Sequence, residues 1–221
     1  ALNLLPIHRA FLESDPVDRH HFNQSVLLET PAGFDQATLQ AVIEAVYRRH
    51  DALRLRFSEH DGRWQAVHAP LDAAMLAASC VLETLPAAVD ERAEFVSARC
   101  NHWQAAFDLT TGPLLRAVHF QAPQGESGGR LLLSVHHAVV DGVSWRILLA
   151  DIEQAYGQHA SGQTIALEAK TSSFQQWGDA LAAYADSPAL RAEKPYWLAQ
   201  SAHAIPALPV DRDAGLGEVS S

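Results

Sequence analysis

The chain has 221 residues, of which 48% are hydrophobic and 19% are charged, and its formal net charge is −10. This length suits one sizeable domain, or half of a larger one. The acidic balance argues against nucleic acid as a partner, because phosphate binding needs a basic surface. No apolar stretch reaches the length of a membrane span and no signal-like pattern opens the sequence, so we expect no membrane contact and a cytoplasmic location.

The first elements are predicted by apolar periodicity. Pro6 suits the first turn of a short helix over 4–12, since the ring fixes a backbone angle that a helix start accepts. Residues 22–29 indicate a strand. Residues 36–49 carry apolar side chains at helical spacing, and two arginines lie in the last turn, where positive charge suits the helix dipole.

Residues 51–57 alternate in polarity as a strand does, and the sequence at 60–63 predicts a hairpin to a returning strand over 64–67. Arg54 and Arg56 lie on the face opposite the apolar side chains. Two arginines on one face are typical of a solvated surface. If this face lies inside a lobe, an arginine on it needs an acidic partner, because a buried unpaired charge is costly.

The remaining chain alternates strands and helices. We expect strands over 79–85, 114–121 and 131–135, a mobile glycine-rich loop at 124–129, and helices over 87–107, 144–156, 172–185 and 188–200. Cys80 and Cys100 lie in separate apolar segments and are interpreted as small buried side chains rather than a disulfide. Residues 208–221 lose this periodicity, which is typical of a linker or hinge.

Two adjacent histidines, His136 and His137, stand where the predicted strand 131–135 gives way to a loop. Side chains alternate across a strand, so the two rings are expected on opposite sides of the sheet if the strand persists that far. Such a pair cannot converge on one metal ion, and Asp141 alone would not complete a tetrahedral set, so no metal is expected. A single neutral imidazole can act as a base. The start of a helix near Ser144 would disfavour a charged imidazole, and its free N–H groups suit developing negative oxygen.

The same residues also have a structural interpretation. Buried histidines commonly bond a carbonyl or carboxylate oxygen, and an aspartate near a helix start is most often a cap. The residue types alone leave the catalytic and the structural interpretations of His136, His137 and Asp141 open, because geometry has to decide between them.

The segment 136–142 reads His-His-Ala-Val-Val-Asp-Gly and resembles the HHxxxDG motif of the condensation-domain superfamily of nonribosomal peptide synthetases. The likeness continues through 143–146. Three further segments resemble the family's motifs in the same order, at 5–12, 49–57 and 108–116. Four ordered motifs make chance similarity an unsatisfactory explanation.

Within the superfamily, the amino-acid sequence at 22–29, 140–148 and 170–177 is more similar to that of an epimerisation domain than to that of a domain that forms peptide bonds. The resemblance then implies inversion of the α-carbon, from L to D, in an aminoacyl or peptidyl thioester. Some condensation domains share part of this sequence, so a peptide-bond-forming condensation lobe is the alternative function. A non-catalytic module that docks carrier proteins is a second alternative.

The fold implied by the resemblance is α/β, an α+β sandwich in which each of two lobes resembles chloramphenicol acetyltransferase, with a mixed sheet flanked by helices. We expect the N-terminal lobe at 1–170, a helical extension that packs on or links the lobe at 171–207, and a hinge or linker at 208–221 toward a missing C-terminal lobe. Family members run to about twice this length. The isolated lobe is therefore expected to be inactive, and its exposed apolar face makes self-association plausible.

The resemblance also implies roles for single residues. His137 would be the catalytic base, supported by His136 and Trp145. Asp141 would be a structural anchor in a salt bridge with Arg54, Gly142 would permit a tight turn, and Ser144 or its backbone would face the thioester. No cofactor is expected on the chain itself, because the substrate would arrive on the 4'-phosphopantetheine arm of a carrier domain. The implied partners are a peptidyl carrier protein domain, adjacent synthetase domains and the C-terminal lobe, which would carry a second group opposite the histidine.

Overall fold

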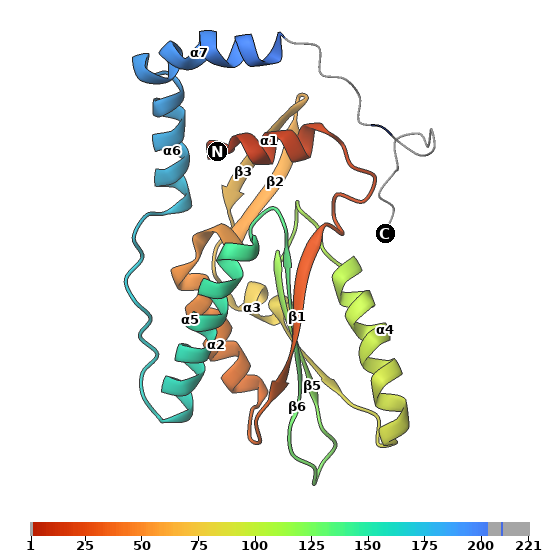
Figure 1. Ribbon diagram of the computed structural model, residues 1–221. Coiled ribbons are helices and arrows are strands. Elements are labelled where there is room, and N and C mark those ends of the chain that lie inside the picture. Colours follow the sequence, from red (N-terminus) through yellow and green to blue (C-terminus); the bar gives the residue numbers. More distant parts are fainter. Residues whose placement is uncertain (1, 203–208, 210–221) are drawn as a thin grey trace.

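The computed structural model describes residues 2–202 and 209 (Figure 1). Within them the larger sheet has the strand order β1-β6-β5-β4, formed by β1 (Asn23–Thr30), β6 (Gly129–His136), β5 (Leu115–Gln121) and β4 (Cys80–Thr84). Strand β6 pairs antiparallel with both β1 and β5, whereas β4 pairs parallel with β5. The sheet is therefore mixed. Together with the helices on its faces, it confirms the predicted fold class.

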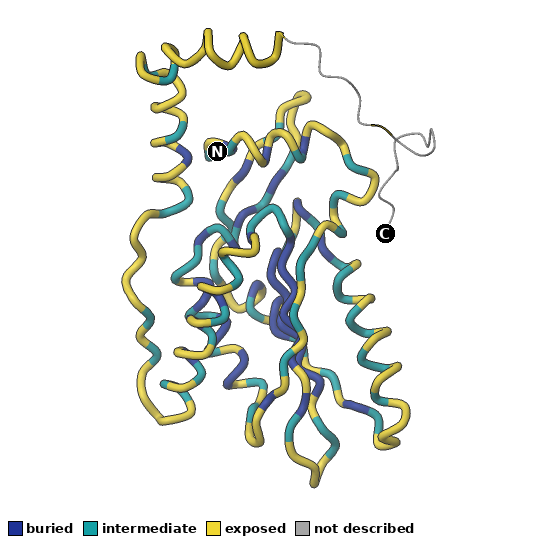
Figure 2. Tube along the Cα trace, viewed as in Figure 1, coloured by how far each residue is buried: buried dark blue, intermediate teal, exposed yellow. Residues whose placement is uncertain are grey.

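Helices cover both faces of this sheet. Helix α2 (Gln36–Arg49) packs beside α5 (Gly142–Ala160) on one face, and the short α3 (Ala73–Ser79) adjoins them. Helix α4 (Arg92–Ala105), which follows the short 3-10 helix η2 (Val89–Glu91), lies on the opposite side of the sheet (Figure 1). Burial is deepest in the strands between these layers (Figure 2).

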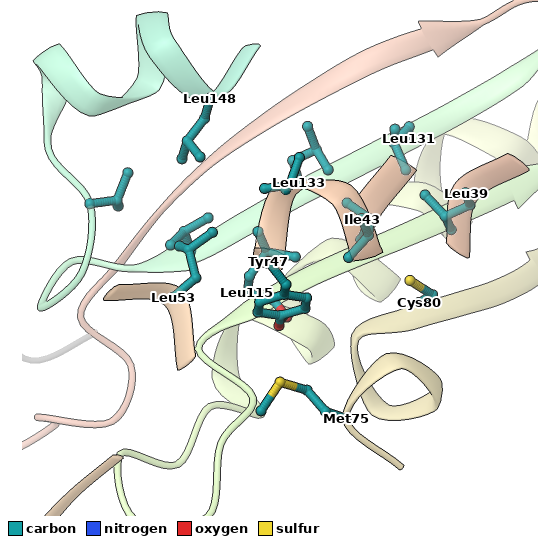
Figure 3. Packing of buried hydrophobic residues seen from close by; sticks show 14 residues of the cluster. Leu39, Ile43, Tyr47, Leu53, Met75, Cys80, Leu115, Leu131, Leu133 and Leu148 are labelled. Carbon is teal, nitrogen blue, oxygen red and sulfur yellow. The ribbon is translucent and has the colours of Figure 1, made fainter. Parts of the chain in front are cut away.

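The alternation of β6 separates two of the apolar core clusters. Leu131, Leu133 and Val135 face α2 and α5, in the cluster drawn in Figure 3. Leu132 points the other way and packs with apolar side chains of β5 and α4. One buried polar contact lies in the first cluster, where the Tyr47 hydroxyl is 2.7 Å from the hydroxyl of Ser79. Each face of the sheet therefore has its own helical cover.

A separate two-stranded sheet, β2 (Leu55–His60) and β3 (Arg63–His68), forms the predicted hairpin and packs with α1 (Pro6–Glu13). The predicted strand over 51–57 is wrong in its first half, because the 3-10 helix η1 (Asp51–Arg54) occupies it. The carboxylate of Asp51 is bound to groups from the far end of the chain, and the backbone turns there before β2 begins. Helix α3 was not predicted; Asp72 caps it by accepting from Met75 N–H at 2.8 Å.

The C-terminal part of the described chain holds α6 (Phe174–Ala185) and α7 (Pro188–Ser201), as predicted. The Asp51 carboxylate accepts from Lys170 at 2.9 Å and from Phe174 N–H at 3.1 Å, so the start of α6 is tied to the lobe. The boundaries at 170 and 207 stay a prediction, and the predicted linker at 208–221 lies outside the described residues apart from Pro209. No helix in the described part is long and apolar enough to cross a membrane.

Candidate active site

The two adjacent histidines have different environments, although β6 ends at His136 and strand alternation does not extend to His137. The His136 side chain is buried, with 0% exposure, and lies near the rings of Phe11 and Phe107. His137 follows the last residue of β6 and is partly exposed. Its ring stacks on Phe22 with centroids 4.7 Å apart and 20° between planes. Only the second histidine is placed to meet a reactant.

Both ring nitrogens of His136 bond to the backbone. Nε2 donates to the Arg19 carbonyl oxygen at 2.8 Å, and Nδ1 accepts from Ala138 N–H at 3.1 Å. Desolvation by burial lowers the pKa of His136 to about 4, although the bond to the Arg19 carbonyl opposes the shift. His136 is therefore a neutral residue that holds two chain segments together. The structural interpretation that the sequence left open describes this histidine.

The two ring nitrogens of His137 have different hydrogen-bond partners. Nδ1 lies 2.7 Å from the Val140 carbonyl oxygen, which can only accept, so Nδ1 carries the proton. Nε2 lies 3.1 Å from the amide nitrogen of Gln24, which can only donate, so Nε2 is the acceptor. This tautomer has its lone pair on Nε2, which is the form that a general base needs once a reactant replaces the Gln24 amide.

Gln24 is a site residue that the sequence reasoning missed. It lies on β1 opposite Val135 of β6, and this register brings its side chain beside His137. Its amide oxygen accepts from the indole N–H of Trp145 at 3.0 Å. In the sequence, Gln24 is one of several polar positions in a predicted strand, and nothing local marks it. Its contact with His137, 113 positions away, exists only because β1 pairs with β6.

The predicted salt bridge between Asp141 and Arg54 is wrong. Asp141 caps α5: its Oδ1 accepts from Val143 N–H at 3.1 Å and from Ser144 N–H at 2.7 Å. These bonds, with that of the Ser144 hydroxyl, hold the pKa of Asp141 below its ordinary value. The Arg54 guanidinium instead donates to the Ala69 carbonyl oxygen at 2.9 Å. The backbone N–H groups at the start of a helix have no partner within the helix. They are closer donors than Arg54, so the Asp141 carboxylate bonds to them.

Two other expected roles are also changed by the geometry. The backbone of Gly142 has no positive φ, and a Cβ there would meet nothing within 4 Å, so no tight turn requires glycine at this position. The Ser144 hydroxyl donates to Asp141 Oδ1 at 2.7 Å. Its backbone N–H is bound to the same oxygen, so Ser144 is engaged in the cap and does not face a thioester in this arrangement.

Among the described residues, Arg56 forms no direct ion pair with a carboxylate, although the charge of Asp108 acts on it. Its guanidinium donates to the carbonyl oxygens of Thr111, at 2.8 Å, and Leu55, at 2.6 Å. Burial lowers the pKa of Arg56. Carbonyl oxygens thus compensate this half-buried charge where a carboxylate was expected.

His137 is partly exposed, and neither of two hollows in the lobe is lined by it. A hollow of about 760 Å³ between α4 and the sheet, and another of about 310 Å³ between α2, α5 and the sheet, are both lined by other residues. Among the described residues, no three His, Cys, Asp or Glu side chains gather as metal ligands would. The arrangement therefore offers one oriented neutral base on a surface, and a reactant held there would need a second wall.

The chain belongs to the condensation domain family, whose sequence model matches residues 6–219. It is 43% identical over 211 residues to a linear gramicidin synthase protein of Brevibacillus parabrevis, covering 95% of this chain and 3% of that protein. It is 35% identical over 208 residues to surfactin synthase subunit 2 of Bacillus subtilis (strain 168), covering 94% of this chain and 6% of that protein.

Solved structures share this fold. The epimerization domain from the third module of tyrocidine synthetase B superposes with a TM-score of 0.83 at 33% identity, covering 97% of this chain and 48% of that chain. The starter condensation domain of rhizomide synthetase superposes with a TM-score of 0.73 at 20% identity, covering 91% and 48%. The second likeness shows the fold alone. This chain thus spans about half the length of these domains.

Proposed function

We propose that this chain is the N-terminal lobe of an epimerisation domain that inverts the α-carbon of an aminoacyl or peptidyl thioester carried on a phosphopantetheine arm. The observation that carries the proposal is the state of His137. Its ring is partly exposed, Nδ1–H donates to the Val140 carbonyl oxygen, and Nε2 is left as the acceptor, beside the Gln24 amide. A carrier protein domain, neighbouring synthetase domains and a second lobe are the partners that this function requires.

The chemistry starts with removal of the α-proton. His137 Nε2 takes the proton, and the electron pair of the C–H bond moves toward the thioester carbonyl, whose oxygen becomes negative. Return of a proton to the opposite face of the carbon gives the other stereoisomer and regenerates the thioester. The second proton must come from a group across from His137. We assign that group to the second lobe, because the hydrogen-bond partners of the His137 ring among the described residues are the Gln24 amide and the Val140 carbonyl, and neither is an acid.

Epimerisation is favoured over peptide-bond formation by the degree of likeness. The epimerization domain of tyrocidine synthetase B is similar in sequence as well as in fold, at 33% identity. The starter condensation domain is 20% identical, which supports the shared fold and nothing finer. The sequence motifs at 22–29, 140–148 and 170–177 support the same choice.

The second candidate function is condensation, and the family match over residues 6–219 is the observation that favours it. In that reaction a histidine in the same place assists attack of an acceptor amine on a donor thioester. The substrate is presented in the same way, but the product is a lengthened chain.

One experiment separates the two reactions. The complete synthetase module that the proposal assigns to this chain is given a carrier loaded with an L-aminoacyl thioester, with and without a second carrier loaded with an acceptor. Epimerisation yields the D-thioester in both cases, which hydrolysis and chiral chromatography detect. Condensation yields a lengthened thioester only when the acceptor is present. Carrier binding without either product would point to a docking module and would contradict the proposal.

A further inference from the structure

We propose that Gln24 and Trp145 are positioning residues for His137. The indole N–H of Trp145 fixes which end of the Gln24 amide faces the histidine, and the amide N–H then holds the Nε2 lone pair in place. This inference rests on the proposed function, in which His137 is the base. It adds two residues that act through that base.

The direction of each hydrogen bond follows from the chemistry of the groups. An indole N–H can only donate, so the Gln24 atom 3.0 Å from Trp145 Nε1 is the amide oxygen. The other end of the amide, which lies 3.1 Å from His137 Nε2, is then the NH2 group. Since an NH2 group can only donate, His137 Nε2 must accept. The bond from His137 Nδ1–H to Val140 requires the same tautomer from the other side of the ring.

The two hydrogen bonds that run from Trp145 through Gln24 to His137 form a relay. This relay opposes a proton on Nε2 in the protein without substrate. A protonated Nε2 would bring an N–H donor against the Gln24 NH2 group. Turning the amide over would give the ring an acceptor, but it would then bring the NH2 group against the donor-only indole of Trp145. Either orientation leaves two donors facing each other. The relay therefore keeps the base ready, and after proton abstraction it favours passing the proton on.

Three elements fix this geometry. Gln24 lies on β1 opposite Val135 of β6, and His137 follows the end of β6. Trp145 lies in the first turn of α5, is partly buried and packs against the core cluster between that helix and the sheet. A rigid donor at one end and a rigid ring at the other leave the Gln24 amide one orientation. Because Nε2 has one lone pair, the substrate C–H has to displace the amide N–H. The hydrogen bond from Gln24 to Nε2 therefore belongs to the protein before substrate binds.

The test is nuclear magnetic resonance of this chain, labelled with ¹⁵N and free of substrate. An N–H···N hydrogen bond transmits a scalar coupling between its two nitrogens, so we expect a coupling between Gln24 Nε2 and a pyridine-like His137 Nε2. The Trp145→Phe variant keeps an aromatic ring but removes the indole N–H, and we expect its coupling to fall by at least half. The matched control is Trp103→Phe on α4, whose indole N–H donates to Glu83 at 2.6 Å; it should keep the full coupling.

A second measurement uses the complete module and needs no change in the core. Gln24→Met keeps the side-chain length without a donor, so the ring of the free protein is no longer held in the reactive tautomer, and we expect kcat/KM for α-proton exchange to fall roughly tenfold. Coupling without His137-dependent exchange would keep the relay and reject the proposed function. The positioning inference is overturned if wild-type protein shows no N–N coupling, if Trp145→Phe retains the full value, or if Gln24→Met exchanges at the wild-type rate.

Discussion

His136 and His137 are neighbours in the chain, yet they carry their ring protons on opposite nitrogens. His136 donates from Nε2 to the Arg19 carbonyl oxygen and accepts at Nδ1. His137 donates from Nδ1 to the Val140 carbonyl oxygen and accepts at Nε2. The first ring is buried, whereas the second is partly exposed and its Nε2 accepts from the Gln24 amide. The two histidines therefore differ in tautomer and in exposure.

The Asp141 cap gives a prediction that differs from the salt bridge expected from the family resemblance. We expect Asp141→Ala to lower the free energy of unfolding by about 0.5–2 kcal/mol, because Val143 and Ser144 lose their acceptor. Asp141→Ser retains a capping oxygen and should lose less. In a double-mutant cycle with Arg54→Ala, urea unfolding should give a coupling energy within about 0.5 kcal/mol of zero. A coupling well above that value would restore the salt bridge.

Burial of His136 makes stability depend on pH. The folded protein keeps this ring neutral down to about pH 4, whereas the unfolded chain protonates it near its ordinary pKa of 6.5. The unfolded state thus binds more protons between these values. The contribution is fully present above pH 6.5 and is lost as the pH falls toward 4, by roughly 3 kcal/mol in total.

Urea unfolding at steps between pH 7.5 and 4.5 measures this loss. His136→Gln keeps a donor for the Arg19 carbonyl but cannot titrate, so we expect a shallower decline. Part of the slope should remain, because burial also lowers the pKa of His8, His68 and His119. The exposed His60 is the control, and His60→Gln should follow the wild type. An unchanged slope in His136→Gln would refute this attribution.

Asp51 ties the start of α6 to the lobe and should control its local stability. Burial raises the pKa of this carboxyl, but the hydrogen bond and charge of Lys170, with the bond from Phe174 N–H, outweigh it and lower the pKa overall. We expect Asp51→Asn to reduce the free energy of unfolding by about 1–3 kcal/mol.

Hydrogen exchange localises this effect. Amide exchange in the first turn of α6 should accelerate in Asp51→Asn, while the amides of β6 keep their relative protection. Asp186→Asn is the matched control, since its ion pair with Arg191 is exposed and should change stability by less than about 0.5 kcal/mol. Equal exchange of α6 in Asp51→Asn and the wild type would show that other contacts hold the helix.

Much of the fold could be predicted from local patterns. The apolar run 131–135 and the helical spacing after it correspond to β6 and α5. The hairpin at 60–63 followed from turn chemistry. These features depend on residues close together in the chain, which periodicity reports directly.

The remaining parts depend on contacts between distant residues. Gln24 meets His137 only because β1 pairs with β6 in one register, and no local pattern specifies that register. Arg54 was assigned to Asp141 by likeness of motifs, although the bonds of each side chain are decided by the nearest available partners. The 3-10 helix at Asp51–Arg54 replaced part of a strand because Asp51 binds Lys170 and Phe174, more than a hundred positions away.

The role of His137 as the base is tested most directly by α-proton exchange in deuterated water, with the complete module and an aminoacyl-loaded carrier. We expect His137→Ala to slow exchange by at least about a hundredfold, the usual contribution of a general base. The exposed His60→Ala should exchange at the wild-type rate, and both variants should bind the carrier as the wild type does. Exchange at the wild-type rate in His137→Ala would contradict the account.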